Sequence, residues 1–445
     1  MVNDLQELMR ENVAAPPPDQ LDLGAVMRSG RRRVRGRRAA VAGGAAALAL
    51  AVTAGLVFTG SDGTGGVDAA DGPPAPDAPT ITLADAERAV AGRDYRVLAQ
   101  YTNRNLDRDN GQYFDGVTDD GLILFRDGPR RGQLYPRLAL LEPGSEEKDW
   151  LPELRSIGQR DLRPVELGAD RLVFLSSGDR ALRGYVFDRA DRSWRIMQWP
   201  SISGLEFPSG VMGPDGRLYV SVPNTEGKPP EGGWPTGSDG EADDSDAEGD
   251  TYRLWSVSLT DEDDVRDEDL THGDVVFTES SMVWTDATNG EAGMVHVRDL
   301  ASDEEHAFDP NSGERCNLLG FGATDERVVM SQYCGDYAGD VRDDRVQVLT
   351  TDGDQVVTLQ DSGVEGGIAS TRGDNPIVMV SAYDRDQGGS YVYDLGSDRF
   401  LRLSRDVSNF DLRGPAPAGQ FLWHTPVNRR HGAKQWVGEL VPAGD

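Results

Sequence analysis

Short runs in which hydrophobic and polar residues alternate recur along this chain from about residue 113 to its C-terminus. One run covers residues 184–188, and after a stretch of Asp, Arg and Ser a second run covers residues 194–196. Alternation with a period of two is typical of β-strands, and Asp, Asn, Gly and Ser between such runs are typical of tight hairpin turns. The pattern predicts a domain that is built almost entirely from hairpins.

The hairpins belong to a larger repeat. Another strand-like run precedes each hairpin, so that four-stranded units recur about every forty residues, a spacing typical of β-propeller blades. Six units are the alternative if the first belongs to a cap, and a β-sandwich is the alternative architecture, because alternation alone does not show radial closure. We count seven units in an all-β propeller, which begin near residues 113, 157, 205, 271, 317, 366 and 410.

Two further elements are predicted ahead of the first unit. Residues 82–85 have the pattern of a capping box with Asp in place of Glu, and they predict a short helix over residues 86–91 that Gly92 ends. A strand-like run follows at residues 95–99. This strand could complete the last unit and close the ring, so that no long edge is left exposed.

The N-terminal part of the chain differs from the rest. Residues 39–59 contain no ionisable side chain, and at about 1.5 Å per residue a helix of this length crosses a hydrocarbon core of roughly 30 Å. Arginine is retained on the cytoplasmic side of a membrane, so a basic cluster ahead of this segment predicts an N-terminus inside the cell. The cluster comprises Arg31, Arg32, Arg33, Arg35, Arg37 and Arg38.

These features predict a single-pass protein of the cell membrane. Residues 1–38 form a basic cytoplasmic tail, residues 39–59 a transmembrane helix, residues 60–80 a linker rich in Gly, Pro and Asp, and residues 81–445 an extracytoplasmic β-propeller. The alternative is a cleavable export signal, since a basic region followed by an apolar core also describes one.

Charge is divided unequally along the chain. The first 38 residues carry eight Arg and five acidic residues, whereas the rest carry 37 basic and 71 acidic residues, a net charge of −34. Such a field repels phosphate backbones, so we expect no nucleic-acid partner. The acidic stretch at residues 231–250 is almost free of apolar residues and predicts a disordered insertion within the third unit.

Cysteine usage agrees with export. The chain has two cysteines, Cys316 and Cys334, and both follow the apolar segment. An even number in an oxidising compartment predicts one disulfide, which would link two strand-like runs and contribute about 3 kcal/mol in the chain-entropy model. A redox or metal site is the alternative, but the spacing is not that of a CxxC motif.

One loop has the spacing of a weak calcium site. Oxygen-bearing side chains occupy every second position at Asn103, Asn105, Asp107 and Asp109, and such alternation is how a loop wraps a hard cation. The glycine of a calcium loop is displaced by one position, to Gly111. An Asx-rich loop without a metal is therefore the alternative, and no other cofactor is expected.

The tryptophans fall into two groups. Trp150, beside charged residues and a proline, and Trp234, within the acidic insertion, are predicted to be exposed and are candidates for stacking on a sugar or peptide. The others lie in strand-like runs, where large aromatic side chains usually pack in a core. They are Trp194, Trp255, Trp284, Trp423 and Trp436.

Two phrases of the sequence, residues 391–395 and residues 213–220, resemble blades of WD40-like and TolB-like propellers. With the arginine cluster and the Ala-rich apolar segment, the chain resembles single-pass envelope proteins of the actinobacterial type. This resemblance implies a scaffold that recognises proteins, peptides or glycans.

Catalytic motifs are missing from the sequence. The five histidines have no ligand spacing, and neither a GxSxG elbow nor a phosphate-binding loop occurs. We therefore expect a non-enzymatic, membrane-anchored binding or scaffold module for a protein or a cell-envelope component. The alternatives are a propeller enzyme, similar to lactonases or quinoprotein dehydrogenases, with its site at the mouth of the central channel, and a structural envelope protein without a small ligand.

Overall fold

In the computed structural model, all described residues belong to the second of two compact units, Ala39–Asp445. Among them, no helix is long and apolar enough to cross a membrane. The predicted tail, transmembrane helix and arginine cluster lie outside the described residues, as does the linker up to residue 77. The described stretches are 78–103, 112–128, 136–154, 162–176, 181–202, 209–227, 249–312, 316–334, 343–361, 364–368, 375–382, 386–406, 416–426 and 433–442.

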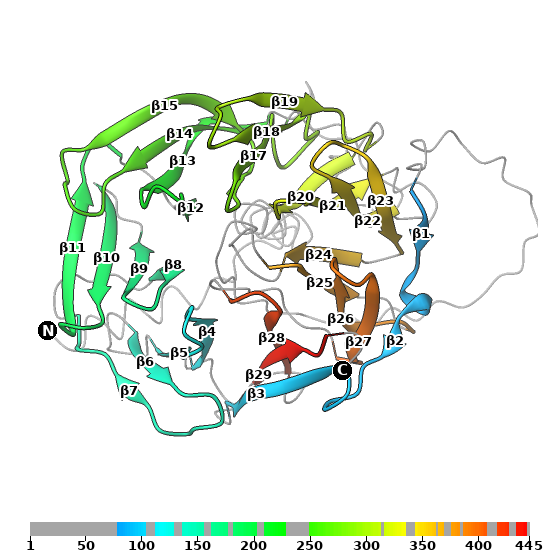
Figure 1. Ribbon diagram of the computed structural model, residues 1–445, viewed down its shortest axis with the longest axis horizontal. Coiled ribbons are helices and arrows are strands. Elements are labelled where there is room, and N and C mark those ends of the chain that lie inside the picture. Colours follow the sequence, from blue (N-terminus) through cyan, green and yellow to red (C-terminus); the bar gives the residue numbers. More distant parts are fainter. Residues whose placement is uncertain are drawn as a thin grey trace, which may run out of the picture. The chain divides into compact units, whose positions relative to one another are not determined.

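Seven β-sheets are arranged around a common axis (Figure 1). In the first four sheets, here blades 1 to 4, consecutive strands pair antiparallel in chain order. Blade 1 contains β4 (Tyr113–Val117), β5 (Ile123–Asp127), β6 (Arg137–Leu141) and β7 (Asp149–Trp150), and blade 2 contains β8 (Arg163–Leu167), β9 (Arg171–Ser176), β10 (Leu182–Asp188) and β11 (Ser193–Trp199). Blade 3 contains β12 (Ser209–Met212), β13 (Leu218–Thr225), β14 (Thr251–Val257) and β15 (Val265–His272), and blade 4 contains β16 (Val275–Phe277), β17 (Ser281–Thr285), β18 (Val295–Asp299) and β19 (Glu305–Phe308).

The next two blades have the same four-stranded core, and each gains a fifth strand from the N-terminal part of the unit. The predicted hairpins of blades 2, 4, 5 and 6 are confirmed. Blade 5 contains β20 (Cys316–Ala323), β21 (Arg327–Cys334), β22 (Asp343–Thr350) and β23 (Gln355–Gln360), and blade 6 contains β24 (Val364–Ile368), β25 (Ile377–Ala382), β26 (Gly389–Asp394) and β27 (Arg399–Ser404).

Blade 7 closes the ring with strands from both ends of the unit. It contains β28 (Gln420–Pro426), β29 (Ala433–Leu440) and β3 (Tyr95–Thr102), and β3 pairs antiparallel with β29. The prediction that the strand at residues 95–99 completes the last unit is confirmed. The chain is a seven-bladed β-propeller.

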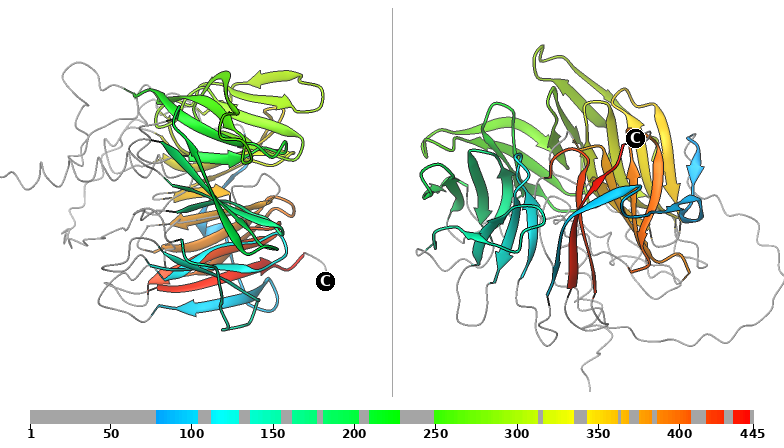
Figure 2. Two further views of the ribbon diagram at one scale, coloured as in Figure 1. Left: turned by 90° about the vertical axis from the view of Figure 1, so that its left-hand side faces the viewer. Right: turned by 60° about the horizontal axis from the view of Figure 1, so that its bottom comes forward.

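An N-terminal strap, residues 80–102, follows the outside of three blades (Figure 2). Its first strand, β1 (Thr80–Ile81), pairs in parallel with β23 of blade 5, and β2 (Glu87–Arg88) pairs in parallel with β27 of blade 6. Between them, Leu83 packs into the core shared by these two blades. The strap ends in β3, so it connects blades 5, 6 and 7.

The prediction of a helix over residues 86–91 is wrong. The capping box is present, since the Thr82 amide donates to the Asp85 carboxylate at 2.7 Å, but the helix that follows it is a single 3-10 turn, η1 (Leu83–Asp85). The chain then extends, because β2 forms backbone hydrogen bonds to blade 6. These tertiary contacts outweigh the weak local preference for helix.

In the part of the chain that the structure describes, the hydrophobic core forms seven clusters, and each lies between two neighbouring blades. Between blades 6 and 7, for example, Met379 packs with Phe421 and Trp423, and the ring of Trp423 stacks on that of Trp436 at 5.1 Å. The prediction that the five strand tryptophans pack in the core is confirmed, because all five are buried or partly buried against these clusters or their aromatic residues.

The two faces of the propeller differ in their connections. In an antiparallel blade, the turns between first and second strands and between third and fourth strands lie at one end, here the turn face. The connections between second and third strands and between blades lie at the other end, here the loop face. The longest connection, residues 226–250 between β13 and β14, belongs to the loop face and contains the predicted acidic insertion, of which residues 249–250 are described.

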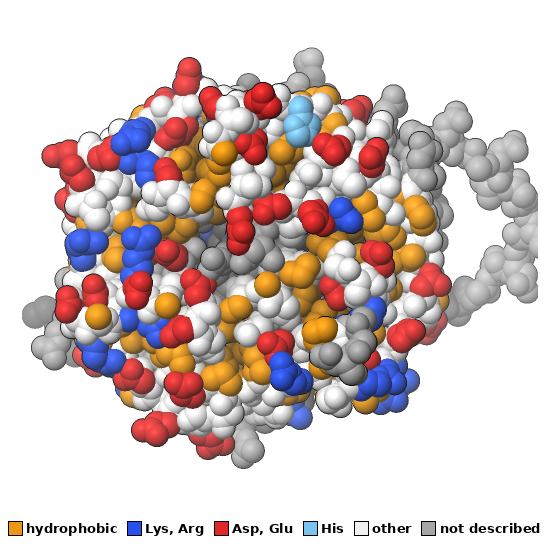
Figure 3. Space-filling view, in the orientation of Figure 1, with side chains coloured by type: hydrophobic (Ala, Val, Ile, Leu, Met, Phe, Trp, Pro, Cys, Tyr) orange, Lys and Arg blue, Asp and Glu red, His pale blue; other side chains and the backbone are white. Residues whose placement is uncertain are grey.

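Acidic side chains of the turn face lie along part of the rim of the hollow at its centre (Figure 3). Two acids of first turns connect neighbouring blades: Arg189 of blade 2 binds Asp120 of blade 1 at 2.7 Å and lowers the pKa of that carboxyl to about 2, and the Ser280 hydroxyl of blade 4 donates to Asp325 of blade 5. We therefore assign Asp120 and Asp325 a structural role. The first turns of blades 1 to 5 carry Asp120, Asp170, Asp215, Glu279 and Asp325.

Candidate functional site

The candidate site is an acidic junction on the loop face, where blades 3 and 4 meet. Two Gly-Asp pairs of blade 3, residues 249–250 and 273–274, lie against the loop 286–294 between β17 and β18 of blade 4. A Cβ atom at Gly273 would be 2.1 Å from the carbonyl carbon of Ala287, and one at Gly249 would be 2.6 Å from the Cβ of Ala287. Only glycine allows the two blades to approach this closely.

Thr288 connects the two aspartates. Its backbone exchanges two hydrogen bonds with Asp250, at 2.5 Å and 3.0 Å, and its hydroxyl donates to Oδ2 of Asp274 at 2.7 Å. Thr288 itself is buried. Thr288 of the neighbouring blade therefore holds the backbone of Asp250 and the carboxylate of Asp274.

The carboxylate of Asp250 is held on both sides. Its Oδ1 accepts a hydrogen bond from the Gly227 amide at 2.7 Å, and its Oδ2 accepts one from Asn289 Nδ2 at 2.6 Å. The backbone N–H of Asn289 in turn donates to the carbonyl of Leu318, in the innermost strand of blade 5, at 3.2 Å. The junction is thus connected to three consecutive blades.

The carboxylate of Asp274 accepts fewer hydrogen bonds from the described residues than that of Asp250. Of the hydrogen bonds formed by the described residues, none reaches its Oδ1, and the residue is partly exposed. No Arg or Lys in the described part of the chain forms an ion pair with Asp274 or with Asp250. Burial raises the pKa of Asp274 to about 6, and only the Thr288 hydroxyl acts in the opposite direction.

Two neighbouring side chains of blade 3 stay neutral at pH 7. Burial, with the nearby charges of Asp250 and Asp274, raises the pKa of Tyr252. His272 is fully buried with its ring centroid 6.1 Å from that of Tyr252, and burial lowers its pKa to about 4. The sequence showed His272 only as one of five scattered histidines.

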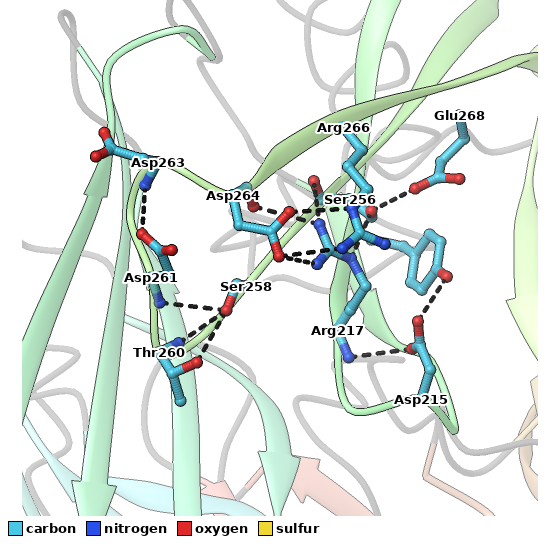
Figure 4. A network of polar contacts seen from close by, with 11 residues as sticks. Asp215, Arg217, Ser256, Ser258, Thr260, Asp261, Asp263, Asp264, Arg266 and Glu268 are labelled. Carbon is cyan, nitrogen blue, oxygen red and sulfur yellow. Dashed lines mark hydrogen bonds and ion pairs between the residues drawn. The ribbon is translucent and has the colours of Figure 1, made fainter.

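A second acidic cluster of blade 3 lies on the turn face and, in contrast to the junction, contains arginine side chains that bind the acids (Figure 4). Arg217 binds Asp264 at 2.6 Å and donates to the Ser256 hydroxyl, and Arg266 binds the same carboxylate at 3.0 Å. The charge of Asp264 is therefore compensated within the protein. At the junction on the loop face, the corresponding cation is missing from the described residues.

The predicted calcium loop lies largely outside the described residues. Asn103 is described and is buried at the end of β3, whereas Asn105, Asp107 and Asp109 are not. Among the described residues, no group of three or more His, Cys, Asp or Glu could hold a metal ion. The calcium site stays a prediction.

Trp150 is partly exposed. Its ring packs at 6.3 Å from that of Phe125, and the guanidinium of Arg137 lies 3.8 Å from its centroid, so one face of the ring is covered. Its role in stacking on a ligand stays a prediction. Trp234 lies outside the described residues.

The two cysteines are partners in the register of blade 5. Cys316, at the start of β20, lies directly opposite Cys334, at the end of β21. Cα atoms of opposite residues in antiparallel strands are about 4.5 to 5.5 Å apart, which is within the span of a disulfide. The bond itself stays a prediction.

Comparison with known proteins gives no family. No family model matches the chain, and no curated protein does either. Solved structures that are similar include a puromycin-hydrolysing peptidase of Mycobacterium tuberculosis (13% identity, 80% of this chain and 52% of that chain, TM-score 0.44), a β-propeller domain from Myceliophteria thermophila (11%, 76% and 99%, 0.40) and TolB from Acinetobacter baumannii (10%, 68% and 61%, 0.35).

The chain spans about half the length of the mycobacterial peptidase. At these identities a likeness concerns the fold alone. The number of blades therefore rests on the strand pairing described above, and any function rests on the chain's own residues.

Proposed function

We propose that this chain is a non-enzymatic binding module that its N-terminal segment anchors in the membrane, with the propeller outside the cell. In this proposal, the junction between blades 3 and 4 binds a basic segment of a partner protein. The observation that carries the proposal is the pair of carboxylates, Asp250 and Asp274, which are fixed in position without a cation from the described residues.

A Lys or Arg side chain of a partner would supply the missing charge. No described residue donates to Oδ1 of Asp274, so this oxygen would accept from the partner, and a charge-assisted hydrogen bond in a partly buried site is stronger than one in bulk water. The net charge of the whole chain, −31, would also steer a basic partner toward it.

The proposal is tested by the affinity of the full-length chain for a labelled peptide of six Arg alternating with Gly. Fluorescence anisotropy at about pH 7.5 should show binding that weakens as salt is added. Asp274→Asn should lower the affinity about tenfold or more, because a charge-assisted hydrogen bond contributes about 1.5 to 3 kcal/mol.

The matched control is Asp352→Asn, which makes the same charge change at a side chain that is 87% exposed on the turn face. It should leave the affinity unchanged. Equal losses in the two variants would mean that the peptide senses only the overall charge, and the junction would not be the site. Mass spectrometry of the recovered peptide should show it intact, whereas cleavage would favour a propeller enzyme.

A further inference from the structure

We infer that the outer edge of blade 2 binds an extended segment of a partner protein, which adds to the blade as a fifth strand. The segment that fits is one in which apolar and basic residues alternate. The site goes beyond the proposed function and is separate from the junction, because it consists of β11, the outermost strand of blade 2 (Figure 1). Addition of a strand to an exposed sheet edge is a common mode of peptide recognition.

The chain itself shows that outer edges of this propeller accept added strands. β1 covers the edge of blade 5 and β2 that of blade 6, both in parallel. In the described stretches, no strand covers the outer edges of blades 1 to 4. Of their outermost strands, β7 has two residues and β19 has four, and β15 is interrupted by a register shift and by Asp269, whose φ is 54°. β11, with seven residues in continuous register, is therefore the longest regular edge that stays uncovered.

The backbone of β11 presents hydrogen-bonding groups to the outside. In an antiparallel pair, successive residues point their N–H and C=O groups alternately toward the partner strand and away from it. Gln198 points away from β10, because its amide donates to the Glu262 carboxylate of blade 3 at 2.9 Å. The N–H and C=O groups of Trp194 and Ile196 must then also point outward. No hydrogen bond formed within the described part of the chain reaches these two outward amides.

Glu262 occupies the position that a carbonyl of an added strand would take. A carboxylate that accepts from an edge amide protects the edge against unspecific pairing. An added strand would replace it with its own carbonyl, and Glu262 would then be able to bind a basic side chain of that strand. Asp261 and Asp263 on either side are exposed, and neither forms an ion pair with a described residue. The acidic neighbours of the edge thus favour a basic partner.

The two sides of β11 determine the order of residues in the partner. On the side of blade 1, Trp194 and Ile196 are partly exposed and pack against the core between blades 1 and 2, and Trp194 Nε1 donates to the Pro152 carbonyl at 2.8 Å. Glu262 approaches from the side of blade 3. Successive side chains of a strand point to opposite sides. Apolar residues of the added strand would therefore lie beside Trp194 and Ile196, and basic residues beside Glu262.

The test measures how the full-length chain binds a labelled peptide of alternating Val and Lys, by fluorescence anisotropy. A peptide with four Val followed by four Lys has the same charge and should bind more weakly. Gln198→Pro removes one outward N–H at an exposed residue and should lower the affinity for the alternating peptide about tenfold or more, because a carbonyl of the added strand is left unpaired. The matched control, Gln198→Ala, keeps this N–H and should bind as the wild type does. Equal melting temperatures would show that both variants are folded.

Hydrogen exchange resolved to single amides provides a second measurement that needs no variant. The amides of Trp194 and Ile196 should exchange quickly in the free chain and at least about tenfold more slowly with the alternating peptide bound. Unchanged exchange at both amides, equal affinity for the two peptides, or no binding of the alternating peptide would overturn the inference. Protection that rises with the concentration of the chain alone would assign the edge to a second copy and overturn the partner inferred here.

Asp274→Asn separates this site from the junction. The variant should leave binding of the alternating peptide unchanged, because β11 does not contribute to the junction between blades 3 and 4. A loss in this variant, with wild-type affinity in Gln198→Pro, would place the peptide at the junction and overturn the inference while the proposed function stands. The proposed function itself fails if the Arg-Gly peptide does not bind, whatever the alternating peptide does.

Discussion

At the scale of single residues, Asp274 and His272 lie two positions apart and are shifted by the same cause. Burial disfavours the charged form of each, so it raises the pKa of Asp274 to about 6 and lowers that of His272 to about 4. Their effects on stability have opposite signs between about pH 4 and pH 6. In the wild type they partly cancel, and single variants should reveal each one.

Asp274→Asn should stabilise the protein at about pH 7.5. The variant removes a charge that no described cation pairs with, while the amide oxygen can still accept from Thr288. Because the folded state binds this proton more tightly than the unfolded chain, the wild-type carboxylate costs stability above its folded pKa and none below about pH 4. Urea unfolding should show a gain of about 2 kcal/mol that disappears near pH 4. A gain that is independent of pH would exclude titration of Asp274 as its cause.

His272→Gln should act in the opposite direction. The folded wild type keeps this imidazole neutral down to about pH 4, whereas the ordinary value is 6.5, so stability that is present above pH 6.5 is lost as the pH falls through this window. Unfolding curves at a series of pH values should show the variant losing about 2 to 3 kcal/mol less than the wild type between pH 7 and pH 4. Parallel curves would contradict the assignment.

At the scale of elements, the strap shows which strands the sequence pattern is sufficient to predict and which it is not. The alternation at residues 95–99 predicts β3 correctly, because this signal is local and the strand is long. The strands β1 and β2 have two residues each, too few for any period, and they form only because blades 5 and 6 offer free edges. The helix prediction for residues 86–91 is wrong because the strand that forms there depends on such a free edge.

Leu83→Ala should weaken the attachment of the strap. Leu83 is 2% exposed and packs against residues of blades 5 and 6, so truncation should cost about 2 to 4 kcal/mol in urea unfolding. Val90→Ala, at a strap residue that is 44% exposed, should cost less than about 0.5 kcal/mol. Similar costs for the two variants would show that the strap does not contribute to the core.

Gly273→Ala should disturb the junction. The added Cβ would collide with the Ala287 backbone, which is 2.1 Å away, so the blade 4 loop has to move. We expect a lower melting temperature together with weaker binding of the Arg-Gly peptide. Gly396→Ala is the matched control, because its nearest neighbour is a side-chain oxygen of Asp394 at 3.4 Å. If Gly273→Ala keeps wild-type stability and affinity, the close approach is not required.

At the scale of the whole molecule, the blade repeat is predictable because each blade is a local series of antiparallel hairpins with its own turn residues. The site is not, because Asp250 and Asp274 meet Thr288 only through packing between blades. The sequence gives no distinctive signal for it: Gly-Asp occurs at 249–250 and 273–274, but also at other places such as 178–179 and 353–354. No single strand pattern shows that the connections ending at residues 250 and 274 share a face.

Photo-crosslinking tests the central claim, that the junction binds a basic segment, most directly. The full-length chain is irradiated with the Arg-Gly peptide carrying a benzophenone, at about pH 7.5 and low salt, and the crosslinked residues are identified by mass spectrometry. The account predicts crosslinks at Tyr252 and within residues 286–290, which Asp274→Asn reduces and Asp352→Asn does not. Crosslinks confined to the turn face, for example at Asp261–Asp264, would contradict it.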